Sequence, residues 1–228
     1  MRIAEIYQSI QGEGVLTGTH SVFVRTSGCN LRCVYCDTPY ASWNPEGDDY
    51  SVDEIIEEIG RFELEHAVLT GGEPMLFAEL VPLCERLRAQ RKHITIETAG
   101  TLYLPLECNL MSISPKLSNS TPSSEEYPRW HQRHEASRYV PNTIRRLIQD
   151  YEYQFKFVIA DPADIVEVEE YLVEFPEIDR DRVLLMPEGC DPTRLQEIQR
   201  WLDEDCQRLG FTVCPRRQIE WFGSVRGT

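Results

Sequence analysis

Short apolar runs alternate with helical patterns along most of this 228-residue chain, and this alternation limits the fold more than any other feature. Each run is long enough for a buried strand, and each helical pattern carries its apolar residues on one face. Strands that alternate with helices form βαβ units, which assemble into a parallel sheet. The predicted strands are residues 20–25, 67–70, 94–97, 110–113, 155–159 and 183–186, and the predicted helical stripes span residues 52–59, 80–87, 165–175 and 195–209.

About six such units fit either a partial barrel or a doubly wound sheet, and periodicity alone does not choose between them. Ser51 and Glu54 form a capping-box pattern, which predicts where the first helix begins. Residues 117–142 break the alternation and are rich in Ser, Pro, Glu and His, which predicts a long loop or an irregular insertion. No internal repeat or long linker divides the chain, so we predict one domain over residues 1–228.

The chain is acidic, with 23 Lys and Arg residues against 38 Asp and Glu residues and a formal net charge of −15. This charge repels nucleic-acid phosphates and anionic membranes, so neither is the expected partner, although a local basic site is compatible with it. No apolar run approaches the roughly 18 residues that span a bilayer, and the first residues lack the pattern of a secretion signal. We therefore predict a cytoplasmic protein.

Eight cysteines need an explanation that suits a reducing compartment, where disulfides are rare. Three of them are clustered as Cys29, Cys33 and Cys36, which favours a metal or iron–sulfur site. A structural zinc ion normally has four protein ligands, so a zinc site here requires a remote fourth Cys or His. A [4Fe–4S] cluster held by three cysteines leaves one iron open for a cofactor or substrate. Cys84 and Cys206 lie on apolar helix stripes and are predicted core residues.

Polar or glycine-rich segments follow five of the six predicted strands. In parallel sheets and barrels the carboxyl ends of the strands meet at one edge, where active sites form. We therefore expect these segments to build one site. They are Cys29–Cys36, Thr70–Pro74, Thr98–Thr101, Ser114–Lys116 and Pro187–Gly189.

The spacing Cys29-x3-Cys33-x2-Cys36 resembles the signature of the radical S-adenosylmethionine superfamily, and Gly71–Pro74 resembles its GGE segment. A more specific resemblance, over nearly the whole chain and weakest at residues 117–142, is to the 7-carboxy-7-deazaguanine synthase family. This resemblance implies an α/β fold, the partial (βα)6 barrel of the radical S-adenosylmethionine type. The segments that carry it are Ser9–Gly14, Phe23–Cys29, Cys36–Thr38, Glu97–Thr101 and Ser114–Lys116.

The resemblance implies a lyase of 7-deazapurine (queuosine) biosynthesis, which converts 6-carboxy-5,6,7,8-tetrahydropterin into 7-carboxy-7-deazaguanine with loss of ammonia. It implies a [4Fe–4S] cluster, S-adenosyl-L-methionine and Mg2+ as cofactors. An electron cleaves S-adenosylmethionine to methionine and a 5′-deoxyadenosyl radical, which takes a hydrogen atom from the pterin before its ring contracts. The further partners that the resemblance implies are an electron donor such as flavodoxin and a second copy of the chain in a homodimer.

The resemblance also implies roles for individual residues. Cys29, Cys33 and Cys36 would hold the cluster, and the Thr38 hydroxyl would bind Mg2+, for which an oxygen ligand is suitable. Without this context, Thr38 is typical of a turn before Pro39. The residues implied for S-adenosylmethionine are Tyr35, Cys36, Asp37, Gly72, Glu73, Ser114, Pro115 and Lys116. Those implied for the substrate are Ile10, Gln11, Gly12, Arg25, Thr70 and Glu97.

Side-chain chemistry suits several of these roles. Gly72 lets the backbone approach the cofactor closely, and Glu73 can accept hydrogen bonds from its ammonium group. Strand alternation places Arg25 on the face opposite Val24, where its planar fork can pair with the pterin carboxylate. Glu97 suits the paired N–H donors of a pterin, although a surface charge at a strand end explains it equally well.

Some features receive no role, and two alternative functions stay open. His131 and His134 have a spacing that suits a metal on a helix, but their surroundings within residues 117–142 predict a solvated loop. Residues 219–228 are expected to fold back over the site, with no assigned contact. A glycyl-radical-enzyme activase shares the cysteine spacing but acts on a partner protein. A zinc-stabilised binding module without catalysis would leave the Gly-Gly-Glu segment unexplained.

Overall fold

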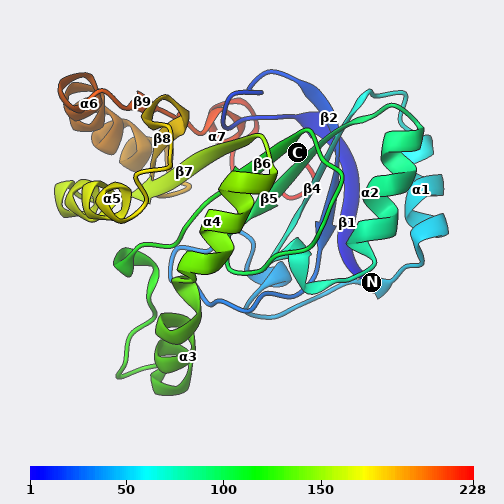
Figure 1. Cartoon of the computed structure of the whole chain (residues 1–228), viewed down its shortest axis with the longest axis horizontal. Coiled ribbons are helices and arrows are strands. Elements are labelled where there is room, and N and C mark those ends of the chain that lie inside the picture. The colour runs from blue at the N-terminus through cyan, green and yellow to red at the C-terminus, as the bar shows by residue number, and fades with distance from the viewer.

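The computed structural model describes residues 1–228, and its nine strands form one twisted sheet (Figure 1). The strands are β1 (Arg2–Ile10), β2 (His20–Thr26), β3 (Asp48–Asp49), β4 (His66–Gly71), β5 (His93–Thr98), β6 (Leu110–Ile113), β7 (Tyr153–Ile159), β8 (Val183–Pro187) and β9 (Thr212–Val213). Their order across the sheet is β3-β1-β2-β4-β5-β6-β7-β8-β9. β1 is antiparallel to β2 and β3, whereas every neighbouring pair from β2 across to β9 is parallel.

Helices connect most of the parallel strands. They are α1 (Val52–Gly60), α2 (Leu80–Ala89), α3 (Pro128–Arg138), α4 (Pro141–Asp150), α5 (Pro162–Glu174), α6 (Pro192–Leu209) and α7 (Arg217–Phe222), with short 3-10 helices η1 (Pro39–Ala41), η2 (Pro74–Leu76), η3 (Ser118–Ser120) and η4 (Arg180–Arg182). In Figure 1, α1 and α2 lie at one end of the sheet, α5 and α6 at the other, and α4 between them. None of the helices combines the length and the apolar character needed to cross a lipid bilayer.

The six predicted strands are confirmed as β2, β4, β5, β6, β7 and β8, and the four predicted helices as α1, α2, α5 and α6. The predicted capping box also forms. The Glu54 N–H donates to Ser51 Oγ at 3.3 Å, and the Ser51 N–H donates to the Glu54 carboxylate at 2.7 Å. A run of adjacent parallel strands with helices outside it is the partial barrel that the resemblance implied.

Alternation along the strands separates the core from the inner face of the sheet. Val22 and Val24 are buried against the helices, whereas Arg25 points to the opposite face and lines a cavity. β7 repeats this pattern, with Phe155 in the core and Lys156 at the cavity. Because successive side chains of a strand point to opposite faces, each parallel strand supplies both the hydrophobic core and the cavity wall.

The predicted irregular insertion at residues 117–142 is wrong over much of its length, because α3 and η3 lie inside it and α4 begins at Pro141. α3 has no apolar stripe, and His134 is the only residue of the helix that is buried. Periodicity therefore gives no signal for α3. β1 is a further element that the pattern does not predict, since most of its residues are half-buried and do not alternate clearly.

Candidate active site

A cavity of about 390 Å³ opens on the inner face of the sheet, at the carboxyl ends of the parallel strands. The segments that follow β2, β4, β5, β6 and β8 all contribute to its wall, as the sequence predicts. Among the predicted site residues, only Glu73 and Pro115 do not line it. The predicted residues that do are Ile10, Gln11, Gly12, Arg25, Cys29, Cys33, Tyr35, Cys36, Asp37, Thr38, Thr70, Gly72, Glu97, Ser114 and Lys116.

The three clustered cysteines lie on residues 27–38, here called the cluster loop, between β2 and η1. Cys29, Cys33 and Cys36 are free thiols, and all three line the cavity. The Cys36 sulfur lies 3.0 Å from the hydroxyl of Ser42. The loop thus brings three soft sulfur donors to one cavity, which is the donor set of an iron–sulfur cluster.

Side chains and backbone from outside the cluster loop hold it in place. The Val34 N–H donates to the Ser120 carbonyl at 3.0 Å, which ties the loop to η3. The indole N–H of Trp43 donates to the Cys33 carbonyl at 3.0 Å. The backbone that carries the thiols is therefore held by contacts with η3 and Trp43.

Burial sets the acid–base state of two of the thiols. It raises the pKa of Cys29 to about 12 and that of Cys33 to about 11. Because iron binds the thiolate, cluster assembly must remove protons from both groups. No group of three or more His, Cys, Asp or Glu side chains is arranged to hold a single metal ion.

His134 corrects the prediction of a solvated loop, because it is 1% exposed and braces the cluster loop from α3. Its Nδ1 accepts the Arg32 N–H at 3.1 Å, and its Nε2 lies 2.9 Å from Ser120 Oγ. The Ser120 hydroxyl itself donates to the Leu117 carbonyl at 2.6 Å, so Nε2 carries the proton and donates. Burial lowers the pKa of His134 to about 4 and keeps the ring neutral.

We expect acid to weaken this brace. The pKa of His134 falls from 6.5 to about 4 on folding. The contribution of the neutral ring to the free energy of unfolding is therefore complete above about pH 6.5 and is lost as the pH falls toward 4. Between pH 7 and pH 5 the free energy of unfolding of the metal-free chain should fall by about 1 to 2 kcal/mol more than that of His134→Gln. Urea unfolding at both pH values measures this difference, and His131→Gln is the matched control. Equal pH dependence in His134→Gln and the unmodified chain would contradict the role of His134.

Gly72 lines the cavity, but its lack of a side chain has a different cause from the expected one. A Cβ at this position would lie 2.2 Å from the Gly28 carbonyl oxygen and 2.5 Å from that of Ala41. Glycine is therefore required so that the turn after β4 can pack against the cluster loop. Close approach to a cofactor is not needed to explain it.

Glu73 also departs from its predicted contact with the cofactor. It is fully buried, and its carboxylate accepts hydrogen bonds from the Ala99 N–H at 2.9 Å, the Thr98 hydroxyl at 2.9 Å and the Met75 N–H at 3.1 Å. Burial raises its pKa. Because internal donors occupy both oxygens, Glu73 fastens the turn after β4 to the end of β5 and does not reach the cavity.

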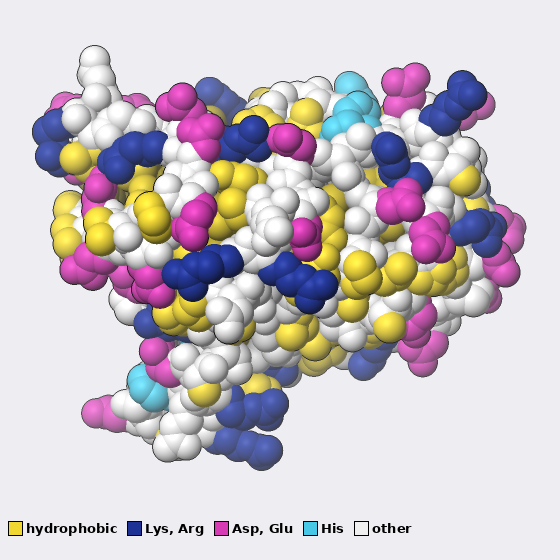
Figure 2. Space-filling model, viewed as in Figure 1, with side chains coloured by type: hydrophobic (Ala, Val, Ile, Leu, Met, Phe, Trp, Pro, Cys, Tyr) yellow, Lys and Arg dark blue, Asp and Glu magenta, His cyan; other side chains and the backbone are white.

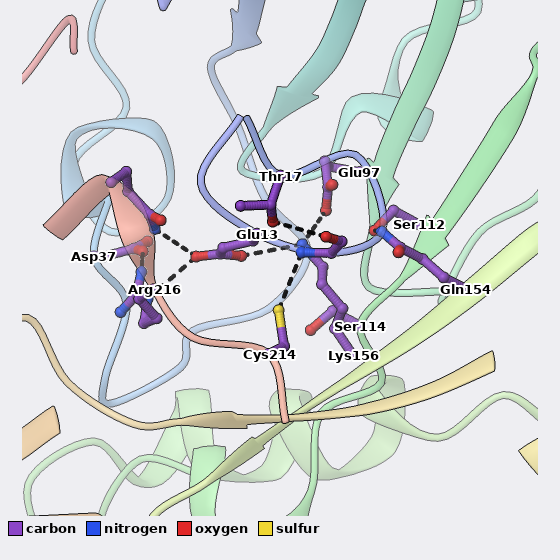
Figure 3. Close-up of polar contacts among 12 residues, drawn as sticks. Glu13, Thr17, Asp37, Glu97, Ser112, Ser114, Gln154, Lys156, Cys214 and Arg216 are labelled. Atoms are coloured by element: carbon purple, nitrogen blue, oxygen red, sulfur yellow. Dashed lines mark hydrogen bonds and ion pairs between the residues drawn. The ribbon is translucent and has the colours of Figure 1, made fainter. Parts of the chain in front are cut away.

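Five charged residues form a continuous chain of ion pairs in the wall of the cavity (Figure 3). Lys156 Nζ lies 2.8 Å from Glu97 Oε2 and 3.1 Å from Glu13 Oε2. Arg216 Nε lies 3.1 Å from the other oxygen of Glu13, and the same guanidinium pairs with Asp37. The chain links the loop after β1, the end of β5, the middle of β7, the cluster loop and the segment before α7.

These charges are maintained at neutral pH by one another. Burial alone would raise the pKa of Glu13, but Lys156 and Arg216 outweigh burial and hold it well below its ordinary value. Burial alone would lower the pKa of Lys156, but Glu97 and Glu13 raise it. The side chain of Lys156 is only 4% exposed, so its ammonium group depends on these two carboxylates.

Sequence reasoning does not assign Glu13, Lys156 or Arg216 to the site. A signal for Lys156 is present, because it is the charged residue within the apolar run 155–159 and alternation places it opposite the buried phenylalanines. Glu13 lies within a segment that carries the family resemblance. Arg216 has no comparable local signal, since only the folded chain brings its segment to the cavity.

Arg25 lies on the predicted face, but part of its guanidinium is already engaged. Nε donates to Glu5 Oε1 at 2.7 Å, and Nη2 donates to the Tyr7 hydroxyl at 2.9 Å. Tyr40 donates to the same Glu5 oxygen at 2.7 Å. These contacts fix the guanidinium and leave Nη1 without a partner in the chain.

The C-terminal residues fold back to the cavity, as expected, and residues 223–228 contribute to its wall. Arg226 fastens them by ion pairs to Glu5 at 3.2 Å and to Glu46 at 2.9 Å. Cys190 also lines the cavity. The tail is therefore part of the site and not a free extension.

An apolar patch completes the wall. Val158, Met186 and Tyr35 line the cavity, and Leu184 and Cys214 pack with them in one small apolar cluster. Cys214 has a further contact, because its sulfur accepts the Gly14 N–H at 3.1 Å and so holds the loop after β1. The cavity therefore combines thiols, paired charges and an apolar surface.

Known proteins match this chain over almost its whole length. Residues 23–119 match the family model described as the Radical SAM superfamily. The chain is 45% identical to the 7-carboxy-7-deazaguanine synthase of Rhodopirellula baltica, over 99% of this chain and 88% of that protein. It is 43% identical to the synthase of the same name from Halobacterium salinarum, over 95% and 88% of the two chains.

Among solved structures, QueE from Escherichia coli has a TM-score of 0.72 and 23% identity, covering 95% of this chain and 93% of that one. This likeness supports the fold of the partial barrel. The curated relatives favour neither an activase nor a zinc-binding module. On the identity shared over nearly its full length, the chain belongs to the 7-carboxy-7-deazaguanine synthase family of the radical S-adenosylmethionine superfamily.

Proposed function

We propose that this chain converts 6-carboxy-5,6,7,8-tetrahydropterin into 7-carboxy-7-deazaguanine with loss of ammonia, as a step of 7-deazapurine (queuosine) biosynthesis. The observation that carries the proposal is one cavity lined both by three free thiols of a single loop and by fixed charged groups. Family membership gives the reaction, and the residues of the cavity suit the groups that it handles.

Cys29, Cys33 and Cys36 would hold the [4Fe–4S] cluster. Bound together, the cluster and S-adenosylmethionine supply a carbon-centred radical that removes a hydrogen atom from the substrate. Within the chain, the apolar patch beside Tyr35 suits a flat ring. Lys116, whose ammonium donates to Ser114 Oγ at 2.7 Å, suits the polar groups of S-adenosylmethionine. The residues proposed to contact S-adenosylmethionine are therefore Tyr35, Cys36, Asp37, Gly72, Ser114 and Lys116.

The substrate is anionic and carries a guanine-like edge. Nη1 of Arg25 has no internal partner and suits the pterin carboxylate. Glu97 pairs with Lys156 through Oε2, which leaves Oε1 to accept N–H groups of the pterin. The remaining residues proposed for the substrate are Ile10, Gln11, Gly12 and Thr70. The Thr38 hydroxyl, which also lines the cavity, is proposed as the protein ligand of Mg2+.

The reaction needs an electron, so we propose an electron donor such as flavodoxin. A homodimer is proposed on the family resemblance. All eight cysteines are free thiols, which supports a reducing compartment such as the cytoplasm.

Complementation tests this function in cells. The chain is expressed in a bacterium that lacks its own 7-carboxy-7-deazaguanine synthase, and queuosine in the tRNA is measured by mass spectrometry. We expect queuosine to return with the unmodified chain and with Cys108→Ala, a thiol outside the cavity, but not with Cys29→Ala. If the cells contain soluble, iron-loaded protein and still make no queuosine, the proposed function is wrong.

A further inference from the structure

α3 projects from the body of the molecule (Figure 1), and its His134 contacts the cluster loop. The exposed side chains of α3 include two arginines. Lys or Arg side chains gather on this projecting helix in Figure 2. Arg129 and Arg133 are exposed, and Trp130 between them is half-buried. We call Arg129, Trp130 and Arg133 the α3 basic surface.

The positive charge of this surface is not neutralised within the chain. Arg129 and Arg133 form no ion pair, and neither does Arg32 of the cluster loop. The guanidinium carbons of Arg32 and Arg133 lie 4.1 Å and 4.7 Å from the ring centre of Trp130, so two like charges share one indole. Glu135, the carboxylate of α3, is already paired with Arg138.

Such a cluster is unexpected in a chain with a formal net charge of −15. Carboxylates are abundant, with Glu125 and Glu126 only a few residues before the helix, yet neither is paired with these arginines. Unpaired like charges raise the local potential and attract a partner of opposite charge. The surface therefore suits an acidic partner, although the chain as a whole repels one.

The α3 basic surface lies beside the cluster loop, and this position indicates what an acidic partner would do there. Arg32, which packs on Trp130, donates from Nη1 to the Cys29 carbonyl at 2.8 Å, and its own N–H is held by His134 of α3. Val34, the next residue but one, is 55% exposed and adjoins Cys33. The α3 basic surface thus meets the outer side of the loop whose thiols face the cavity.

We infer that the α3 basic surface, with the outer side of the cluster loop, is the docking site of an acidic one-electron carrier protein. The reduced carrier gives up one electron and the cluster accepts it, and no covalent bond forms or breaks. This inference rests on the proposed function, since only a cluster in the cavity needs this electron. Small, charge-guided encounter surfaces are typical of electron-transfer partners.

The test measures how fast reduced flavodoxin, an acidic carrier, reduces the cluster of the reconstituted chain in anaerobic stopped-flow experiments. Arg129→Glu/Arg133→Glu changes the local charge by four units. We expect its second-order rate to fall at least about 10-fold at low salt and the difference to shrink at high salt. Arg88→Glu/Arg200→Glu is the matched control, because both residues are exposed, form no ion pair and lie outside α3 and the cluster loop, although Arg88 donates a hydrogen bond to Asn109. Its rate should change less than about 2-fold.

Two further measurements separate the possible failures. Turnover with dithionite in place of the carrier should be equal in all variants, since neither pair belongs to the cavity. If dithionite gives no product even with the unmodified chain, the proposed function fails independently of the docking site. Arg129→Gln/Arg133→Gln changes the local charge by half as much and should give an intermediate rate. This variant provides the test if Arg129→Glu/Arg133→Glu does not fold.

The inference is overturned if the reversal on α3 leaves carrier-driven reduction unchanged, or if the control slows it equally. It is also overturned if the reversal changes the oligomeric state by light scattering while the rate of reduction stays the same. That last outcome would assign the surface to a second copy of this chain.

Discussion

Cys33→Ala is expected to bind less than one iron per chain after anaerobic reconstitution, against about four for the unmodified chain, and to make no 7-carboxy-7-deazaguanine. The reason is that the cluster loop carries three thiols and all three would be ligands, so the loop holds no substitute for Cys33. Iron and sulfide analysis, together with the visible absorption of the protein, measures assembly directly.

The control for this variant is Cys108→Ala, which removes a half-buried thiol that does not line the cavity. It should retain about four irons and full turnover. Normal iron content or turnover in Cys33→Ala would contradict the assignment of this residue as a ligand. A colourless chain that holds one zinc ion would contradict the cluster itself.

Lys156→Met is expected to lower both stability and activity. The ammonium group links Glu13 and Glu97 at 3.1 Å and 2.8 Å, and its removal leaves two carboxylates facing a space with less compensating charge. Breaking a buried pair of this kind costs about 3–5 kcal/mol of unfolding free energy. We expect kcat/KM for the pterin to fall about 100-fold, because Glu97 loses the contact that positions it.

Two variants separate loss of charge from loss of shape. Lys156→Arg keeps a cation and should retain more stability than Lys156→Met. Adding Glu97→Gln to Lys156→Met removes one of the two stranded carboxylates and should restore part of the lost stability. Urea unfolding measures all four proteins. If Lys156→Met lies within about 0.5 kcal/mol of the unmodified chain, the ion pairs do not contribute as described.

The same ion pairs predict an acid dependence. The pKa of Glu13 lies below its ordinary value of 4.5, so its contribution to stability is present above about pH 4.5 and is lost as the pH falls through the lower, folded value. Lys156→Met removes one of the two cations responsible. The slope of stability against pH below 4.5 should therefore be shallower in this variant.

The parallel sheet and the cluster loop could be predicted because their signals are local. In β2 the alternation of Val24 and Arg25 already separates the core from the cavity, and three cysteines within eight residues already indicate a shared site. Segments that follow different strands meet because parallel strands end at one edge. Such arguments need only short-range pattern and topology.

The parts that were not predicted depend on contacts between distant residues. α3 is polar on all sides, and its helix becomes evident only through the burial of His134 against the cluster loop. Arg216 reaches Glu13 across about two hundred positions of sequence, which no local pattern encodes. Glu73 was placed at the cofactor because a motif gives residue types but not the direction in which each group points.

The charges that line the cavity are nearly balanced, although the chain as a whole is acidic. Five basic and four acidic side chains line the cavity, although the whole chain carries −15. Arg25, Lys116, Lys156 and Arg216 are among the basic side chains. The cavity is thus nearly balanced, and an anionic substrate does not meet the acidity of the outer surface.

The most direct test of the central claim is the product formed from 6-carboxy-5,6,7,8-tetrahydropterin by the anaerobically reconstituted chain with S-adenosylmethionine, Mg2+ and dithionite. Mass spectrometry of one reaction detects both 5′-deoxyadenosine and the purine product. We predict 5′-deoxyadenosine together with 7-carboxy-7-deazaguanine. Formation of 5′-deoxyadenosine without any 7-carboxy-7-deazaguanine would contradict the assigned substrate, even though the radical chemistry of the superfamily would remain.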